Sequence, residues 1–518
     1  MNTALAKAIE LGYQSELPTI VLGKALYEGE VIHSAPIQLP LKSLNRHGLI
    51  AGATGTGKTK TLQLMAEALS DAGVPCLLMD LKGDLSGLAA PGNKDNTHIK
   101  DRHAILEIEY KANGYPVELL SLTDPKMTRL RATVLEFGPI LLSKVLELNE
   151  NQEGVMSVVF KYADDHQLPI VDLEDLKSVL RYLSNEGREE LKKEYGFISP
   201  SSVGAIMRKI VGLEQQGAES FFGEPSFDVD DLLRLDDKGR GYLSIMRLTD
   251  IQNRPKLFST FMLSLLAEIY SSFPEEGDLD KPKLCIFIDE AHLVFKESSK
   301  ALLDQLESVV KLIRSKGVGI FFCTQSPGDV PDSILSQLGL KVQHALRAFT
   351  AKDRKEIRLV AQNYPESEFY KVEDLLTSLG IGEAAITGLD RKGRPTPIAH
   401  TYLVAPASRM DILEPKEIED VLDNSKIQKK YAKTIDKDSA HEILERKLNK
   451  LAIAEEELAE AELEAKEKAK SKKVRRKTRA EASTLEKVLR SPVAKSFGVA
   501  LIGTLTRALF GTLGKRRR

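Results

Sequence analysis

The sequence predicts an α/β fold with a mostly parallel sheet, interrupted by a helical insertion and followed by a helical, charged C-terminal region. Short apolar runs alternate with segments of helical spacing over residues 41–137, and the same alternation resumes over residues 236–406. Between these two parts, residues 138–235 show helical spacing separated by polar loops. We therefore expect residues 41–137 and 236–406 to form one core, with 138–235 inserted into it and 407–518 outside it.

The first 40 residues are short and mixed in character. They contain two strand-like stretches, PTIVLGKAL and EVIHSAPIQL. They are too few for a separate barrel, so residues 1–40 are expected to form an arm or ribbon on the core.

A glycine-rich loop follows the first core strand. Residues 52–59 read GATGTGKT, which matches the phosphate-binding loop of P-loop NTPases. An apolar run, 48–51, leads into the loop, and a helical stretch, 60–69, leads out of it. Glycines let the backbone approach an anion, and the N–H groups at the helix start point at phosphate oxygens. The residues expected to contact the nucleotide are Gly52, Ala53, Thr54, Gly55, Thr56, Gly57, Lys58, Thr59 and Lys60.

This loop predicts binding of ATP with Mg²⁺. Lys58 is expected to reach the β and γ phosphates, and the Thr59 hydroxyl is expected to be a Mg²⁺ ligand.

The remaining core strands are predicted from apolar runs. The run 74–80 ends in the polar turn DLKGD, 80–84, at the carboxyl edge of the sheet, where open α/β folds bind ligands. Further strands are expected at 115–122, 132–137, 241–248, 284–288, 318–324, 341–349 and 399–406.

A second acidic motif completes the expected ATP site. The apolar run LCIFI, 284–288, ends in Asp289 and Glu290, which is a Walker B pattern. Asp289 is expected to hold Mg²⁺, and Glu290 is expected to orient and deprotonate the attacking water. A glutamate in this second place favours hydrolysis over binding alone. The letters DEAH, 289–292, also occur in a helicase class, but the second motor motif of that class does not follow.

Four more polar residues are candidates for sensing the γ-phosphate. Gln325 ends the strand next to Walker B, where an amide can hydrogen-bond the phosphate or couple it to a partner; an ordinary polar strand end is the alternative. Arg46, Arg314 and Arg347 are candidate arginine fingers, in the same subunit or from a neighbour, because Lys58 alone does not neutralise the transition-state charge. Surface arginine is the alternative for each.

Composition indicates a soluble chain. Hydrophobic residues make up 42% and charged residues 29%, and 73 basic residues nearly balance 75 acidic ones. Net charge therefore predicts neither nucleic-acid nor membrane binding. The three cysteines, Cys76, Cys285 and Cys323, lie in apolar runs without metal-ligand spacing, which is typical of buried thiols in a reducing cytoplasm. The start of the chain lacks a signal-peptide pattern, and no run is long enough to span a bilayer.

The C-terminal region changes character twice. Residues 439–470 are rich in Ala, Glu, Leu and Lys, which predicts a solvated helix or a short coiled coil. Residues 466–479 form a basic run. The tail, 497–514, is apolar with glycines and basic flanks. We expect it to pack on the core or on another subunit, with contact to a membrane surface or to nucleic acid as the alternatives.

Taken together, these motifs resemble one known group. The sequence NRH before GATGTGKT, then IDEAH, then IRSKGVGIFFCTQSP, resembles the HerA/FtsK group of P-loop ATPases, and within it a bacterial HerA-like branch, the YjgR-type. DLKGDLSGLA, 80–89, and the glycine-rich tail with its basic end are also similar to that branch. The resemblance covers nearly the whole chain.

The resemblance implies a RecA-like core that assembles into a hexameric ring with ATP at subunit interfaces. It implies that Arg46 acts on the neighbour's nucleotide and that Gln325 is a sensor. Arg314 takes the place of the arginine in the group's EGRKFG segment, which reads LIRSKG here, so the arginine is kept without its neighbours. Archaeal members carry an N-terminal β-barrel that 40 residues cannot supply, so docking through it is not expected.

Three functions compete at this stage. The first is an ATP-driven hexameric DNA translocase or helicase, and the second is an ATPase switch or regulator that does not move nucleic acid. The third, a small-molecule kinase, is disfavoured by Glu290 and by the candidate arginine fingers. Aromatic residues are 6% with no tryptophan, so DNA would be held through its phosphates and not by base stacking.

Overall fold

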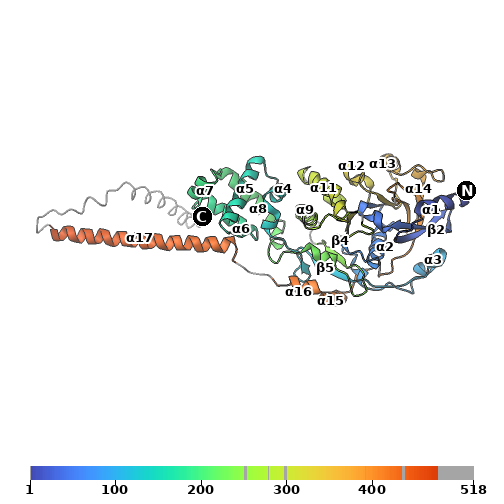
Figure 1. Cartoon of the computed structure of the whole chain (residues 1–518), viewed down its shortest axis with the longest axis horizontal. Coiled ribbons are helices and arrows are strands. Elements are labelled where there is room, and N and C mark those ends of the chain that lie inside the picture. Colours follow the sequence, from blue (N-terminus) through green and yellow to red (C-terminus); the bar gives the residue numbers. More distant parts are fainter. Residues whose placement is uncertain are drawn as a thin grey trace, which may run out of the picture. The chain divides into compact units, whose positions relative to one another are not determined.

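The computed structural model describes residues 2–249, 254–277, 279–296, 300–390, 392–433 and 438–476. The chain divides into two units, Met1–Leu444 and Glu445–Arg518 (Figure 1). The predicted tail, 497–514, and the last residues of the basic run, 477–479, lie outside the described residues. The first unit contains the sheet and every predicted site residue.

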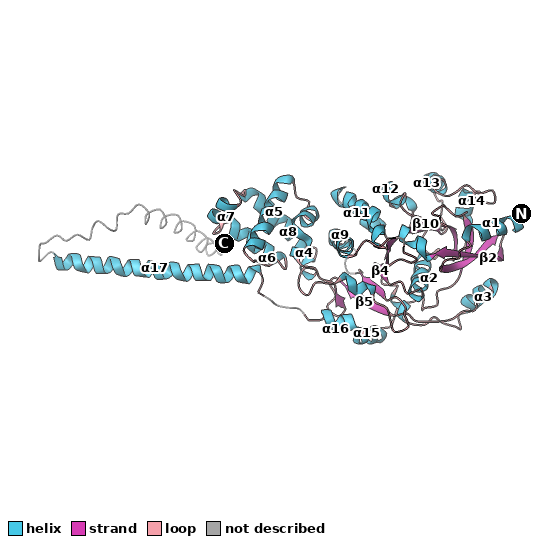
Figure 2. Ribbon diagram, viewed as in Figure 1, coloured by secondary structure: helices cyan, strands magenta, loops and turns pink. Residues whose placement is uncertain are grey.

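The first unit contains a twelve-stranded sheet in the order β2-β1-β12-β11-β10-β3-β9-β8-β4-β7-β5-β6. Its strands are magenta in Figure 2. From β10 to β6 all neighbours are parallel. The parallel strands are β3 (Gly48–Ala51), β4 (Cys76–Asp80), β5 (Val117–Ser121), β6 (Thr128–Arg129), β7 (Leu243–Arg247), β8 (Leu284–Ile288), β9 (Val318–Thr324) and β10 (Leu340–Gln343). Strands β3, β4, β5, β8 and β9 are buried throughout, as expected of parallel strands covered on both faces.

The other end of the sheet is antiparallel. Strands β1 (Thr19–Tyr27) and β2 (Glu30–Pro40) form a hairpin, and β1 pairs with β12 (Ala399–Leu403). Strand β12 pairs with β11 (Glu383–Thr387), which pairs with β10. The N-terminal ribbon is therefore part of the sheet itself, and helix α1 (Asn2–Tyr13) packs against it.

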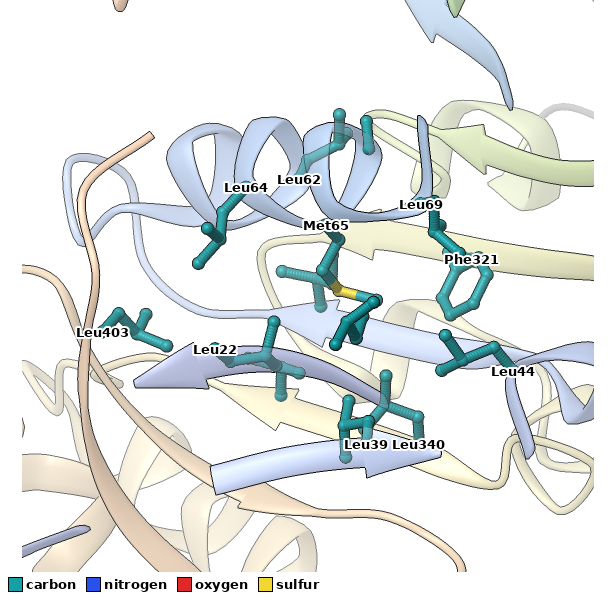
Figure 3. Close-up of a cluster of buried hydrophobic side chains, with 14 of the residues drawn as sticks. Leu22, Leu39, Leu44, Leu62, Leu64, Met65, Leu69, Phe321, Leu340 and Leu403 are labelled. Carbon is teal, nitrogen blue, oxygen red and sulfur yellow. The ribbon is translucent and has the colours of Figure 1, made fainter. Parts of the chain in front are cut away.

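Helix α2 (Lys58–Asp71) leaves the glycine-rich loop and lies against the sheet (Figure 3). Its apolar side chains enter a core cluster with residues from β1, β2, β9, β10 and β12. The members labelled in Figure 3 are Leu22, Leu39, Leu44, Leu62, Leu64, Met65, Leu69, Phe321, Leu340 and Leu403. The three cysteines are free and buried in β4, β8 and β9, as predicted.

Five helices occupy most of the segment between the two halves of the core. They are α4 (Val134–Val145), α5 (Glu150–Asp165), α6 (Leu173–Ser184), α7 (Arg188–Glu194) and α8 (Pro200–Glu214). They pack on one another, and α4 also contacts α9 (Pro255–Ser272) and α11 (Lys300–Ile313). The other helices are α3 (Thr97–Leu106), α10 (His292–Lys296), α12 (Asp332–Leu335), α13 (Ala351–Ala361), α14 (Val372–Ser378), α15 (Pro415–Asn424) and α16 (Lys426–Tyr431).

Two strand predictions were wrong, the first over its whole length and the second beyond Gln343. The run 132–137 is not a strand, because Thr133 accepts a hydrogen bond from the Glu136 amide and the Glu136 carboxylate accepts one from the Thr133 amide. This reciprocal capping box starts α4. The strand predicted over 341–349 ends at Gln343, so Arg347 lies beyond β10. Beyond β10 the Ala345 carbonyl accepts a hydrogen bond from the Ala53 amide of the glycine-rich loop.

Of the stretch predicted to be helical, 439–470, all residues from 440 onward lie in α17 (Ala440–Arg476). The start of this helix is fixed to α6. The Asp175 carboxylate accepts hydrogen bonds from the Ser439 hydroxyl (2.5 Å) and the His441 amide (2.8 Å).

Candidate functional site

The glycine-rich loop, 52–57, joins β3 to α2 at the carboxyl edge of the sheet. Three neighbouring segments hold its backbone. The Gly52 amide donates to the Thr324 carbonyl at the end of β9, and the Ala53 amide donates to Ala345 (2.9 Å). The Thr56 carbonyl accepts from the Gly382 amide (3.2 Å). The loop is therefore preformed, with its conformation set by the sheet around it.

Gly52 shows why the loop needs glycine. Its φ is +152°, and a Cβ added there would lie 2.5 Å from the Cβ of His344. His344 is buried beneath the loop and its Nε2 lies 2.9 Å from the Thr61 hydroxyl of α2. Burial lowers the pKa of His344 to about 4, so the ring is neutral at pH 7. His344 thus supports the loop, a role that the sequence alone did not indicate.

Lys58 and Thr59 begin α2. Lys58 is only 7% exposed, and its ammonium donates to the carbonyls of Gly52 (2.8 Å) and Ala53 (3.2 Å). The lysine therefore lies over the loop, where a bound phosphate chain would sit. Burial, together with the nearby Lys82, lowers the pKa of Lys58, and Glu290 and Asp289 oppose that change.

Asp289 and Glu290 follow β8, which is separated from β3 by β9 alone. The two carboxylates are 2% and 7% exposed. Among the described residues, Asp289 Oδ2 and Glu290 Oε2 are both buried without a hydrogen-bond partner. Buried acceptors of this kind normally have partners, so two orphaned oxygens on adjacent residues indicate a place for a ligand.

The backbone and electrostatics of this pair support that assignment. Glu290 has a φ of 45°, an uncommon conformation for a residue with a side chain and one that is concentrated at functional sites. Burial raises the pKa of Asp289 to about 6, with Lys82 opposing the shift. A Mg²⁺ ion would favour the ionised Asp289, and Thr59 and Asp289 supply the hard oxygen ligands that it prefers. The residues present therefore fit ATP with Mg²⁺.

Lys82 is a site residue that sequence reasoning missed. It lies in the turn after β4, and its ammonium forms an ion pair with Glu290 Oε1. His292 Nδ1 lies 3.2 Å from Glu290 Oε2, without hydrogen-bond geometry. Burial lowers the pKa of Lys82, but the hydrogen bond that Lys82 donates to Glu290 and the charge of Asp289 outweigh this effect, so the pKa is raised. The signal available in the sequence was the polar turn DLKGD at the end of a buried strand.

Gln325 and Arg347 lie at the same edge of the sheet as the loop. Gln325 is exposed and follows Thr324, whose carbonyl accepts a hydrogen bond from the Gly52 amide. Arg347 is also exposed and follows Ala345 by two residues. The Ala345 carbonyl accepts a hydrogen bond from the Ala53 amide. Both side chains therefore start close to the phosphate loop of their own subunit.

Arg46 and Arg314 lie at the opposite edge. Arg46 ends the 3-10 helix η1 (Leu41–Arg46), before the amino end of β3, and Arg314 begins η5 (Arg314–Lys316), before the amino end of β9. Both line one cavity of about 540 Å³. Parallel strands separate this cavity from the phosphate loop, so the structure does not bring these two arginines to Lys58.

His47 fixes Arg46 in place. The His47 Nδ1 accepts a hydrogen bond from the Ile320 amide (3.0 Å), and its Nε2 lies 2.9 Å from the Val310 carbonyl. The ring must therefore carry its proton on Nε2, and burial lowers its pKa to about 4. This single neutral ring joins η1 to β9 and α11.

A second cavity, of about 290 Å³, adjoins the first turn of α2. Lys60 lines it and donates to the Met410 carbonyl, so its ammonium is directed at the chain after β12 and not at the loop. Leu64, Ile99 and Val404 give the cavity apolar walls, and Arg102 closes one side through hydrogen bonds to Gly382 (3.1 Å) and Leu403 (2.9 Å).

None of the described helices is long and apolar enough to cross a membrane. A preformed phosphate loop and a carboxylate pair two strands away define a P-loop ATPase. The chain belongs to the family described as helicase HerA-like C-terminal, which matches residues 27–518. The resemblance to the HerA/FtsK group is thereby confirmed.

Two relatives illustrate how far the similarity extends. The chain is 22% identical over 404 residues to the DNA double-strand break repair helicase HerA of Sulfolobus acidocaldarius, covering 73% of this chain and 70% of that protein. It is 23% identical over 401 residues to the protein of the same name in Sulfurisphaera tokodaii, covering 73% of this chain and 70% of that one.

The fold is similar to that of solved structures. The trigonal form of the bacterial conjugative coupling protein TrwBdeltaN70 in complex with sulphate has a TM-score of 0.52 and 16% identity, over 79% of this chain and 95% of that chain. The unbound monoclinic form gives 0.50 and 16%, over 79% and 94%. These likenesses concern the fold alone, and they confirm the predicted α/β architecture.

Proposed function

We propose that this protein is an ATP-hydrolysing motor that moves DNA and works as a hexameric ring with ATP between subunits. One observation carries the proposal. The phosphate loop and the acidic pair lie at one edge of the sheet, whereas Arg46 and Arg314 line a cavity at the other. A nucleotide bound at Lys58 would meet these arginines only if a second copy of the chain presented them.

Within one subunit the chemistry divides among few side chains. Lys58 moves from the loop carbonyls to the β and γ phosphates and neutralises part of their charge. Glu290 accepts the proton of the attacking water through Oε2, the oxygen that has no hydrogen-bond partner among the described residues. Gln325 and Arg347 contact the γ-phosphate from the ends of β9 and β10. Thr59 and Asp289 would hold Mg²⁺, which would supply charge stabilisation at the phosphates when bound.

The cavity next to the first turn of α2 is the place for the nucleoside. Its apolar walls suit a purine ring, and Lys60 and Arg102 also line it. The loop residues from Gly52 to Thr59 then hold the phosphates, so one continuous site runs from α3 to β8.

The names of two relatives support DNA as the substrate. The relatives in Sulfolobus acidocaldarius and Sulfurisphaera tokodaii are named DNA double-strand break repair helicases.

The three cysteines are buried free thiols, which fit a reducing compartment. We therefore propose that the protein works in the cytoplasm.

The test is the ATPase rate with and without duplex DNA over a range of salt concentrations. A motor that grips phosphates will be stimulated by DNA, and the stimulation will fall steeply as salt rises from about 50 to 200 mM. A rate indifferent to DNA at every salt concentration would instead identify an ATPase switch. Mass measurement with a non-hydrolysable ATP analogue, with and without duplex DNA, tests the hexamer separately.

A further inference from the structure

The contact between Lys82 and Glu290 joins two neighbouring strands at the candidate site. Strands β4 and β8 are paired in parallel, with Met79 opposite Ile288, so the residues that follow both strands emerge side by side. Lys82 reaches across this boundary to Glu290 Oε1. The Glu290 side chain is 8% exposed and that of Lys82 is 41% exposed, so a partly solvated cation holds a buried carboxylate.

The turn that carries Lys82 is itself fixed. The Asp80 carboxylate accepts hydrogen bonds from the amides of Gly83 (2.6 Å), Asp84 (3.3 Å) and Leu85 (3.1 Å). Asp80 is fully buried, and Gly83 has a φ of +81° that a side chain would strain. Lys82 is therefore presented from a rigid turn, and its position does not depend on a flexible loop.

The two oxygens of Glu290 have different environments. Oε1 is bound by Lys82, whereas Oε2 is buried and has no hydrogen-bond partner in the part of the chain that the structure describes. A carboxylate anchored through one oxygen keeps the other in a defined direction. This is the arrangement that a general base needs, since a small misplacement of a catalytic group lowers the rate strongly.

We propose that Lys82 is a positioning residue that anchors Glu290 through Oε1, so that Oε2 faces the attacking water. This inference rests on the proposed role of Glu290 and adds to it the residue that sets its direction. Lys82 acts through Glu290 and does not itself touch the reacting atoms. The rigid turn 80–84 is thus part of the catalytic apparatus.

Breaking an ion pair between two exposed side chains would have little effect on the protein, but this ion pair contains a buried carboxylate. Removing the lysine would leave a buried carboxylate without its cation, and the side chain would turn toward other donors or toward solvent. His292, whose Nδ1 lies 3.2 Å from Oε2 without hydrogen-bond geometry, is one polar side chain beside the carboxylate. Turnover should therefore fall while ATP binding, which depends on the loop 52–59, stays intact.

The test uses the full-length protein and the variants Lys82→Met, Lys82→Gln and Lys82→Arg. Nucleotide affinity, melting temperature and kcat are measured for each. We expect Lys82→Met and Lys82→Gln to lower kcat about 10- to 100-fold with affinity changed by less than about threefold, and Lys82→Arg to recover part of the loss. Lys161→Met, which breaks an exposed ion pair with Asp165 in α5, is the matched control and should leave kcat unchanged.

A double-mutant cycle distinguishes positioning from a direct role. In a Glu290→Gln background, loss of Lys82 should cost less than about twofold more under single-turnover conditions, because its action passes through Glu290. Multiplying losses would show that Lys82 acts on the phosphates and would overturn the inference, as would unchanged or raised kcat in whichever Lys82 variant still binds nucleotide. Full turnover in Glu290→Gln alone would instead overturn the proposed role of Glu290.

Discussion

Arg46 and Arg314 line the same cavity at the amino ends of β3 and β9, at the edge of the sheet opposite Lys58. The two residues come from distant parts of the chain, and His47 holds the first of them against β9 and α11. An arginine pair in this position can complete an ATP site only on a neighbouring subunit.

Mixed rings test this relationship. Arg46→Ala and Lys58→Ala should each abolish most ATP turnover alone. When the two proteins are mixed in equal amounts, about a quarter of the interfaces combine an intact Lys58 with an intact Arg46 from the neighbour, so activity should reappear. The measurement is the ATPase rate against mixing ratio, which should peak near equal amounts.

Mixing Lys58→Ala with Glu290→Gln is the control for these rings. Lys58 and Glu290 belong to the same site, so no interface regains both and the rate should stay low. An Arg46→Ala and Lys58→Ala mixture that stays as inactive as this control would place Arg46 outside the neighbour's site.

Gly52→Ala should damage the loop. The added methyl would lie 2.5 Å from His344 Cβ at a φ of +152°, so we expect a loss of about 1–3 kcal/mol in the free energy of unfolding and weaker nucleotide binding. Gly154→Ala in α5, where a Cβ has open space, is the control and should stabilise by about 0.5–1 kcal/mol. Denaturant unfolding and fluorescent-nucleotide titration measure both. Normal binding by Gly52→Ala would show that the loop can relax.

Because the pKa of His47 is lowered in the native protein, we expect the protein to lose stability in mild acid. The pKa of His47 is about 4 in the native protein and about 6.5 when unfolded, so between these values the unfolded chain binds more protons. Stability from this ring is therefore complete above about pH 6.5 and is lost as the pH falls toward 4, by about 3 kcal/mol. His344 contributes with the same sign.

Buried carboxyl groups work against this trend, so the variant comparison is essential. Burial raises the pKa of Glu67 and Glu268 to about 7, which favours the native state as the pH falls. The difference in unfolding free energy between wild type and His47→Gln, measured from pH 7 to 4, isolates the ring. A gap that stays constant with pH would mean that the pKa of His47 is the same in the native and the unfolded protein.

Glu290→Gln should separate binding from hydrolysis. The amide keeps the shape of the side chain but cannot take the proton of water, so we expect kcat to fall at least about 100-fold. Binding of ATP through the loop should be unchanged within about threefold. Single-turnover hydrolysis and equilibrium binding measure the two quantities. Turnover near the wild-type rate would remove Glu290 from the reaction.

The parts of the fold that could be predicted from the sequence are those that a short stretch of sequence determines by itself. The loop 52–59 and the acidic pair after β8 each lie within a single strand and its turn, and periodicity revealed the surrounding strands. The capping box of Thr133 and Glu136 was also visible in the sequence, but the apolar letters between them were interpreted as a strand.

Relationships between distant segments could not be predicted in this way. The pairing of β4 with β8 brings Lys82 to Glu290, and spacing in the sequence does not determine which strands become neighbours. Similarly, only the sheet order places Arg46 and Arg314 in one cavity and His344 under Gly52. These contacts follow from packing, which no single segment encodes.

The most direct measurement is a structure of the assembled protein with a non-hydrolysable ATP analogue and Mg²⁺. We expect the γ-phosphate to contact Lys58 and the metal to lie beside Thr59 and Asp289. We also expect Glu290 Oε2 to face the γ-phosphate and Arg46 of the adjacent subunit to reach the nucleotide. A triphosphate bound far from Asp289 and Glu290 would contradict the account.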